Sequence, residues 1–261
     1  MPQVLSINIR NNRLGAALIF LVSAFALSGI FFIEPIAQST QYHQFVDQRS
    51  FFAIPNFLNV VSNSGFFLLG IYGVYLLAIR KTANILQQIR PFYVVLYSGV
   101  ALVGLGSAYY HIWPDNMTLV WDRLPMTISF MAFFSIVVAE FISVKLAKIL
   151  FVPLLLAGFG SVGFWVYGEL NGTGDLRPYV LVQFLPIILT PIILIIYRSS
   201  FDKTAAYWWL LVSYIIAKLF EHFDAEIFAA LGFVSGHSLK HLAAAIGLFL
   251  LLMSYQYRTA V

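Results

Sequence analysis

Apolar segments of about 20 residues recur along the whole chain, and this recurrence sets the fold class. Eight segments are apparent, at roughly 14–33, 55–79, 91–112, 118–143, 149–168, 177–198, 206–226 and 234–256. Each is close to the ~20 residues that an α-helix needs to cross the hydrocarbon core of a bilayer. The sequence therefore predicts an all-α integral membrane protein with several transmembrane helices.

The composition leaves little room for a separate soluble domain. Hydrophobic residues make up 61% of the 261 residues and charged residues 10%, whereas soluble domains carry roughly 25% charged residues. We predict a seven-helix membrane domain over 55–261, preceded by a transmembrane helix and an outer loop over 1–54. The first apolar segment follows Arg10 and Arg13 and could instead be a signal peptide. Its apolar run is longer than the roughly 7–15 residues of a signal-peptide core, which favours a retained helix.

The residue types present restrict the possible chemistry. Because the chain has no cysteine, disulfides, thiolate metal sites and cysteine nucleophiles are excluded, and any metal must be bound by histidines and carboxylates. The basic residues are spread between the apolar segments, so the net charge of +4 does not indicate nucleic-acid binding. The partner that the composition indicates is the bilayer, and no feature points to an obligate protein partner.

Charged residues are distributed unequally between the two ends of the predicted helices. If the N-terminus lies on the cytoplasmic side, ten of the fifteen lysines and arginines lie there too, as in most membrane proteins. We therefore expect both termini in the cytoplasm, in a bacterial inner membrane or an organelle membrane. All five histidines then lie toward the non-cytoplasmic side: His43, His111, His222, His237 and His241. This bias predicts an active site at the non-cytoplasmic end of the bundle.

Three stretches bring polar residues to that end. "GSAYYH" carries Ser107 and His111, "WDRLPM" carries Asp122, and "GHSLKH" carries His237 and His241. The four-residue spacing places Ser107 and His111 on one helix face, and His237 and His241 on another. A tight turn over 114–116 ("PDN") allows His111 and Asp122 to approach each other.

Two histidines one helical turn apart can bind a single metal ion. A catalytic zinc takes three protein ligands and one water, so His111 is the natural third ligand beside His237 and His241. The bound water would become a nucleophile near neutral pH. Asp122 could then orient this water or accept its proton, and Ser107 could donate a hydrogen bond to the oxyanion. The competing interpretation is that each histidine only hydrogen-bonds a neighbouring helix.

Five further polar residues are candidates for shaping the site from behind the ligands: Asn59, Ser62, Asn63, Glu221 and Asp224. The first three form a polar stripe that could equally serve hydrogen bonding between helices. Either carboxylate could accept a hydrogen bond from a ligand histidine, and we expect Glu221 to pair with Lys218. We expect Lys240 to extend outward from the histidine face. His43 and Asp47 match no motif and are expected to cap an outer loop.

These stretches resemble the alkaline ceramidases, which belong to a wider group of seven-helix membrane hydrolases that includes the adiponectin-receptor-like proteins. The resemblance lies in "NFLNVVSN", in "GSAYYH" followed by "WDRLPM", and in "GHSLKH", over about residues 55–257. It implies a zinc-dependent amidase that splits ceramide into a sphingoid base and a fatty acid. The implied zinc ligands are His111, His237 and His241, with Asp122 acting on the water and Ser107 near the oxyanion.

One segment departs from that family. Eukaryotic alkaline ceramidases carry an acidic, tryptophan-containing calcium-binding segment just before the stretch that resembles "NFLNVVSN". Here Asn56 stands where that segment has a Glu, and Asp47 is the one obvious hard oxygen ligand nearby, whereas calcium takes six to eight oxygens. A calcium site like the family's is therefore doubtful, and the segment is more like that of bacterial or divergent members.

The sequence thus predicts a zinc-dependent intramembrane amidase acting on ceramide or a related sphingolipid. Two alternatives stay open. The same zinc site could hydrolyse another lipid amide or an ester, because the residues do not specify the substrate. The polar cluster could also belong to a lipid-sensing receptor or a transporter without hydrolytic activity, although no internal repeat typical of transporters is apparent.

Overall fold

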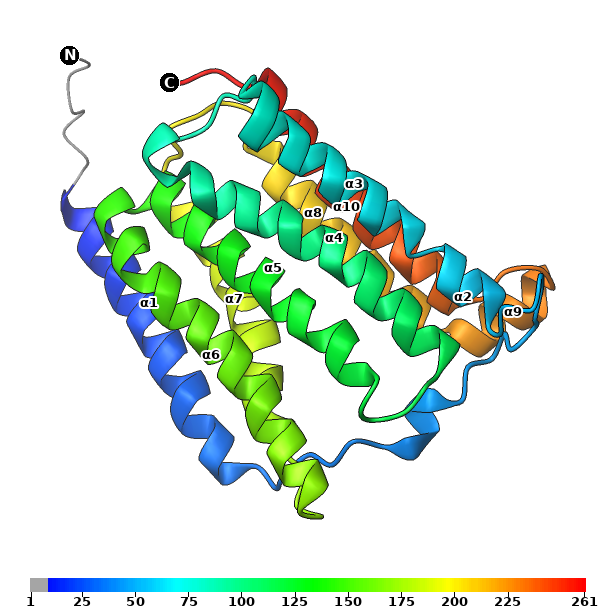
Figure 1. Cartoon of the computed structure of the whole chain (residues 1–261). Coiled ribbons are helices and arrows are strands. Elements are labelled where there is room, and N and C mark those ends of the chain that lie inside the picture. Colours follow the sequence, from blue (N-terminus) through cyan, green and yellow to red (C-terminus); the bar gives the residue numbers. More distant parts are fainter. Residues whose placement is uncertain (1–8) are drawn as a thin grey trace.

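The computed structural model describes residues 9–261, and these fold into a bundle of α-helices without a β-strand (Figure 1). The helices are α1 (Ile9–Gly29), α2 (Phe57–Val61), α3 (Ser64–Val74), α4 (Arg90–Ile112), α5 (Leu119–Phe141), α6 (Val144–Leu170), α7 (Arg177–Ile196), α8 (Ala205–His222), α9 (Asp224–Leu231) and α10 (Gly236–Tyr257). A π-helical segment, η3 (Tyr75–Arg80), prolongs α3, and the 3₁₀ turn η4 (Gln87–Ile89) precedes α4.

Seven helical segments in the described part of the chain are long and apolar enough to cross a membrane. This confirms the predicted all-α membrane fold. The remaining long helix, α8, packs against α10 inside the same bundle, but its end carries Lys218, Glu221 and His222. The predicted segment at roughly 206–226 corresponds to α8, which ends at His222, and the short α9 begins after Phe223. Charged and polar residues lie on both sides of this break, at the polar end of the bundle.

Close helix packing depends on glycines at the crossing of α3 and α4. A side chain at Gly70 would overlap the backbone of Ala101, and one at Gly104 would overlap the backbone of Phe67. Small residues at such crossings let helix backbones approach closely inside a membrane. This packing holds the C-terminal end of α4 against α2.

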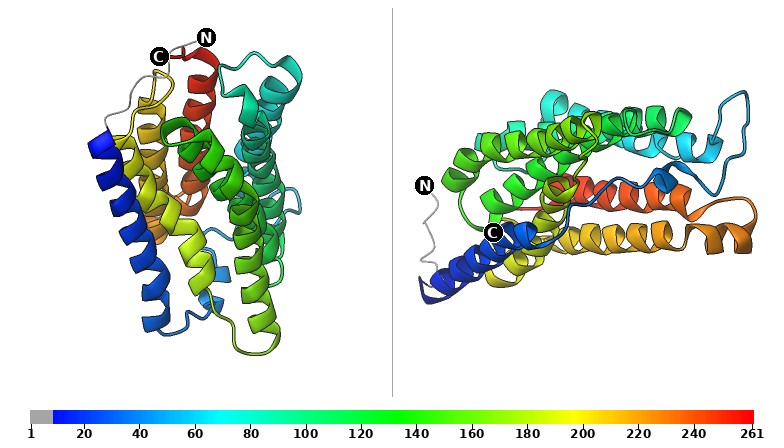
Figure 2. Two further views of the ribbon diagram at one scale, coloured as in Figure 1. Left: turned by 90° about the vertical axis from the view of Figure 1, so that its left-hand side faces the viewer. Right: turned by 90° about the horizontal axis from the view of Figure 1, so that it is seen from below.

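The bundle has two chemically different ends. Helix α10 begins at the end where α4 finishes and runs to the opposite end, where the C-terminus lies and where α1 begins (Figures 1 and 2). Helix α1 lies at the flank of the bundle against α7. The connection 33–56 crosses the histidine end and is held there by a hydrogen bond from Leu176 N to Ile36 O (2.8 Å).

At the end of the bundle opposite the histidines, a buried ion pair holds the C-terminal residues against α5. The guanidinium of Arg258 donates to both carboxylate oxygens of Glu140, at 2.8 and 2.5 Å. The hydroxyl of Tyr207 donates to the same carboxylate at 2.7 Å, and the hydroxyl of Tyr93 also donates to it. All four side chains are buried. A buried charge pair is stable only when its remaining hydrogen-bonding positions are filled, so the tyrosines are part of the clamp.

We expect Tyr207→Phe to lower the thermal midpoint of the protein in detergent. The change removes a charge-assisted hydrogen bond and should cost about 1.5–3 kcal/mol. Tyr257→Phe is the matched control, because that ring is exposed on the last turn of α10, and it should change stability by at most about 0.5 kcal/mol. Equal midpoints for the two variants would contradict a stabilising role for the clamp.

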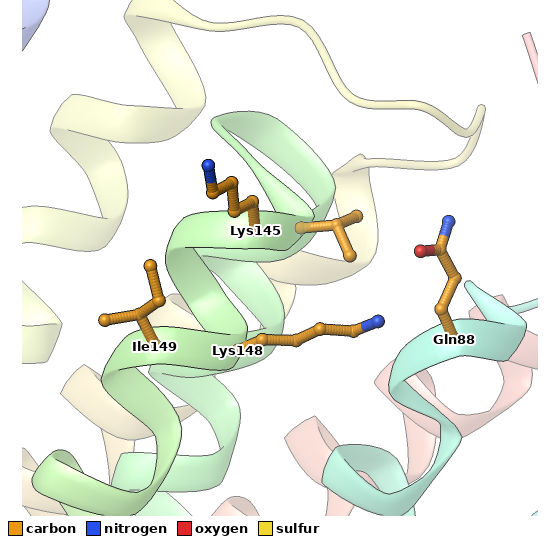
Figure 3. Close-up of a pocket in the computed structure, with 5 residues that line it drawn as sticks. Gln88, Lys145, Lys148 and Ile149 are labelled. Atoms are coloured by element: carbon orange, nitrogen blue, oxygen red, sulfur yellow. The ribbon is translucent and has the colours of Figure 1, made fainter.

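A shallow pocket lies at this same end, between η4 and the start of α6 (Figure 3). Its lining residues are Gln88, Val144, Lys145, Lys148 and Ile149. The two lysines are its only charged groups, and it has no histidine or carboxylate that could bind a metal. The pocket is therefore separate from the predicted site.

Candidate metal centre

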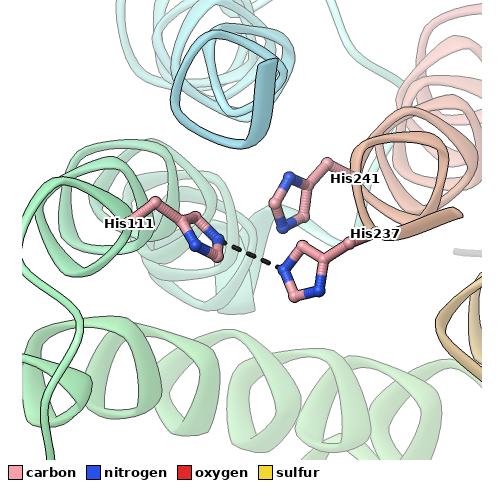
Figure 4. A group of neighbouring side chains, drawn as sticks. All are labelled: His111, His237 and His241. Carbon is pink, nitrogen blue, oxygen red and sulfur yellow. Dashed lines mark hydrogen bonds between the residues drawn. The ribbon is translucent and has the colours of Figure 1, made fainter. Parts of the chain in front are cut away.

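Three histidine side chains from two helices converge at the opposite end of the bundle (Figure 4). His111 lies in the last turn of α4, and His237 and His241 lie in the first two turns of α10. All three are buried, and one ring nitrogen of each lies within 4.8 Å of the others. The Nε2 atoms of His111 and His237 are 3.3 Å apart. The structure thus brings together the three residues that the sequence spacing predicted as ligands.

Local sequence features position these helix ends. Ser235 caps α10, because its hydroxyl accepts a hydrogen bond from Ser238 N at 3.3 Å. Gly236 follows, and a side chain there would overlap Phe220 O of α8. The amide of Asn56 donates to His111 O at 2.8 Å, which satisfies a carbonyl at the end of α4. The two helix ends are therefore held at a fixed separation.

The polar stripe formed by Asn59 of α2 and by Ser62 and Asn63 between α2 and α3 contacts the start of α10. The hydroxyl of Ser62 donates to Asn59 O at 3.1 Å, and Ser62 Oγ lies 2.8 Å from His241 Nδ1. When the hydroxyl proton of Ser62 is directed to Asn59 O, the Ser62 oxygen can accept from Nδ1–H of His241. In that tautomer the Nε2 lone pair of His241 is available for a metal. Asn59 Oδ1 also accepts from Ser238 Oγ at 2.8 Å, and Asn63 Nδ2 donates to Asn59 O at 2.7 Å.

The two predicted carboxylates, Glu221 and Asp224, lie next to the histidines but do not bond their rings in the described structure. Asp224 Oδ1 accepts from the backbone N–H of His237 at 2.7 Å and so holds the first turn of α10. Glu221 pairs with Lys218 at 2.6 Å, as predicted, and also with Lys240 at 2.9 Å. Asp224 therefore holds the backbone of His237, whereas Glu221 holds the neighbouring Lys240.

Lys240 does not extend outward, and that expectation is wrong. Its ammonium lies 3.2 Å from His237 Nε2, the nitrogen that faces His111, and its side chain is only 18% exposed. Because α8 packs against α10, the Glu221 carboxylate draws Lys240 toward the histidines. A positively charged donor therefore belongs to the centre.

Ser107 and Asp122 meet across α4 and α5. Ser107 is buried one turn before His111, and its side chain interacts with the Asp122 carboxyl in the first turn of α5. The contact is possible because the two backbones nearly touch: a side chain at Gly106 would overlap Trp121 O. The Asp122 carboxyl group also interacts electrostatically with the ammonium of Lys240. The predicted acid and hydroxyl thus lie beside each other at the depth of the histidines.

We expect Gly106→Ala to lower the stability of the protein. Alanine normally favours a helix over glycine by about 1 kcal/mol, but here the methyl group would force α4 and α5 apart at a cost of about 1–3 kcal/mol. Gly163→Ala in α6 is the matched control, because no atom lies within 4 Å of the added methyl group. The thermal midpoint should fall for the first variant only. A stabilised Gly106→Ala protein would refute the close crossing.

The connection 33–56 closes the centre from outside, which the sequence did not predict. Phe45 is buried with its ring centroid 4.7 Å from that of His111 and 5.2 Å from that of His237. His43 bonds Tyr110 OH at 2.9 Å and Asn116 Oδ1 at 2.7 Å. Both ring nitrogens of His43 are therefore engaged, and this residue fastens the loop to the end of α4 rather than binding a metal.

Asp47 fastens the other side of this loop. Its two carboxylate oxygens each accept from Arg49 at 2.8 Å, and Arg49 in turn donates to Phe233 O at 2.8 Å. The Arg49 guanidinium holds the pKa of Asp47 below its usual value, so the carboxylate stays ionised at neutral pH. Both oxygens of the only acid predicted as a hard ligand in this loop are thus used by arginine.

The three histidines fit a metal ion. Two nitrogen ligands about 2.0–2.1 Å from a tetrahedral zinc lie about 3.3 Å apart, and the Nε2 atoms of His111 and His237 have this separation. His111 Nδ1 is buried without a hydrogen-bond partner among the described residues, so no contact at Nδ1 competes with a metal for this ring. Three neutral imidazoles are a preferred donor set for zinc and other transition metals. The centre can therefore hold a metal ion.

The fold and the centre together define a multi-helix membrane protein with a buried three-histidine site. The ceramidase family model matches residues 50–261, and the chain belongs to that family. Membership implies a hydrolase that acts on the amide bond of a lipid, and it confirms the resemblance seen in the sequence motifs. Comparisons with curated proteins and with solved structures each gave no match.

Proposed function

We propose that this chain is a zinc-dependent intramembrane amidase that hydrolyses the N-acyl bond of ceramide or a related sphingolipid. The observation that carries the proposal is the buried cluster of His111, His237 and His241, which offers three nitrogen donors within 4.8 Å of one another, two of them at the 3.3 Å separation of zinc ligands. Its place inside a membrane bundle suits a lipid substrate, and family membership supports amide chemistry.

The residues around the histidines supply the remaining steps of amide hydrolysis. Bound zinc would supply a Lewis acid for the amide carbonyl and a water of lowered pKa. Asp122 accepts a proton from the attacking water and delivers a proton to the amine as the C–N bond breaks. Ser107, beside Asp122, donates a hydrogen bond to the oxyanion that forms on the acyl carbon. The products are a fatty-acid carboxylate and a sphingoid amine.

The surroundings of the centre favour access from the membrane. Phe45 and the loop 33–56 cover its outer side. An apolar groove of about 300 Å³ lies between α4 and α5, and it is lined by Leu102, Leu105, Gly106, Tyr109, Trp121, Leu124, Pro125 and Ile128. Two of these residues directly precede Ser107 and Asp122 in the chain. The groove could therefore hold an acyl chain with its amide next to the catalytic residues.

The orientation of the chain in the membrane belongs to the same proposal. Ten of the fifteen lysines and arginines belong to the segments at the end opposite the histidines, which favours that end as the cytoplasmic one. The centre then opens to the periplasm or to an organelle lumen. Two single-cysteine variants of this cysteine-free chain, Lys148→Cys and His222→Cys, test the orientation. Intact cells are treated with a membrane-impermeant alkylating reagent. Only the His222→Cys variant should react.

Hydrolysis of defined lipids tests the function. Purified protein should convert ceramide to sphingoid base and fatty acid, both detected by mass spectrometry, and a chelator should stop the reaction until zinc is restored. An N-acyl lipid without a sphingoid base and an ester of the same acyl chain complete the panel. Turnover of these lipids but not of ceramide would show that the substrate is a different lipid. Binding of a lipid without any product would contradict enzymatic activity.

A further inference from the structure

Two lysines share one carboxylate next to the histidines. Glu221 accepts from two lysines, Lys218 at 2.6 Å and Lys240 at 2.9 Å, so two ammonium groups share one carboxylate. Two more carboxylates lie nearby, Asp122 beside Ser107 and Asp224 at the backbone N–H of His237. Lys240 is nevertheless the ammonium that reaches the histidine rings. A cation inside a bundle is stabilised where an anion can pair with it, so Lys240 offers a contact for an anion bound at the histidines.

The two lysines differ in where they point. Lys218 is 42% exposed and has Glu221 as its partner, whereas Lys240 is 18% exposed and reaches His237 Nε2 at 3.2 Å. This nitrogen cannot both accept a hydrogen bond and bind a metal with its one lone pair. The ammonium of Lys240 has three N–H groups, so one remains beyond its bonds to Glu221 and His237. Binding of a metal ion to His237 would free a second N–H of Lys240 directly beside that ring.

The proposed reaction produces an anion at this place. Water oxygen bonds to the acyl carbon, the C–N bond breaks, the amine leaves with a proton, and the acid loses its proton to become a carboxylate. We propose, on the basis of the proposed function, that Lys240 binds this carboxyl group, and that the centre therefore prefers a fatty-acid anion over a neutral lipid of the same chain length. Glu221 holds the ammonium in place for this contact.

Affinity for a matched pair of probes tests the assignment. Dodecanoate and 1-dodecanol share a chain and differ in charge, and their binding to the purified, metal-containing protein can be measured by titration calorimetry in detergent. Lys240→Met should weaken dodecanoate binding by about tenfold or more, the loss expected for a charge-assisted hydrogen bond, and should leave 1-dodecanol binding nearly unchanged. Lys218→Met is the matched control and should preserve the preference for the anion.

A second measurement separates Lys240 from the metal. The metal content of each variant is determined, and the titrations are repeated after a chelator has removed the metal from wild type and Lys240→Met alike. The loss of dodecanoate binding should persist between these metal-free proteins. Equal affinities of wild type and Lys240→Met, or an equal loss for both probes, would overturn the assignment. Either result is independent of whether ceramide is hydrolysed, so this inference and the proposed function can fail separately.

Discussion

His237→Ala should remove both the metal and the hydrolytic activity. Wild-type protein is expected to hold about one zinc per chain, because the described residues form one three-histidine cluster. With two histidines left, zinc should be lost during purification, and ceramide hydrolysis should fall by at least about a thousandfold, since both the Lewis acid and the activated water disappear. Elemental analysis and product quantification by mass spectrometry measure the two effects.

The control for this experiment is His222→Ala. His222 lies at the same end of the bundle but is exposed and outside the cluster, so its removal should change neither zinc content nor rate by more than about twofold, as for most exposed positions. Full zinc content and full activity in His237→Ala would contradict the proposed zinc site. Loss of activity in both histidine variants to the same extent would point to a general effect on folding.

The parts of the site that depend on local spacing were predictable from the sequence. His237 and His241 share a face of α10 because they are four residues apart, and Ser107 and His111 do so on α4 for the same reason. The turn over 114–116 is short enough to return the chain beside itself, which brings Asp122 to Ser107. These relations need only helical periodicity and one tight turn.

The parts that depend on packing between distant segments were not predictable. Lys240 is one residue from His241, and its sequence position alone suits an outward side chain; its true direction is decided by Glu221 on α8. Phe45 lies in a loop without periodicity, so no pattern links it to the histidines. The polar residues His43 and Asp47 beside it are the only hint that this loop is held in place. His43 bonds Tyr110 in α4, and Asp47 pairs with its neighbour Arg49, which reaches Phe233 O; both contacts cross to distant parts of the chain.

Substituting Asp122 with asparagine should separate proton transfer from metal binding. The amide has the shape of the carboxyl group but cannot accept a proton, and Asp122 lies beside Ser107 rather than among the three converging nitrogens. Zinc content should therefore be unchanged, while the rate of ceramide hydrolysis should fall by about 10²–10⁴, the usual contribution of a general base. Rates are compared at saturating substrate so that a change in binding does not obscure the chemical step.

Asp115→Asn is the matched control, because it makes the same chemical change at an exposed position of the turn between α4 and α5. The Asp115 carboxylate accepts from Thr118 N at 2.7 Å, and an asparagine carbonyl can accept the same bond, so the rate should change by no more than about twofold. A wild-type rate in Asp122→Asn would show that another group carries the proton. Loss of zinc from that variant would instead make Asp122 a ligand, and a lowered thermal midpoint with intact chemistry would assign it to packing between α4 and α5.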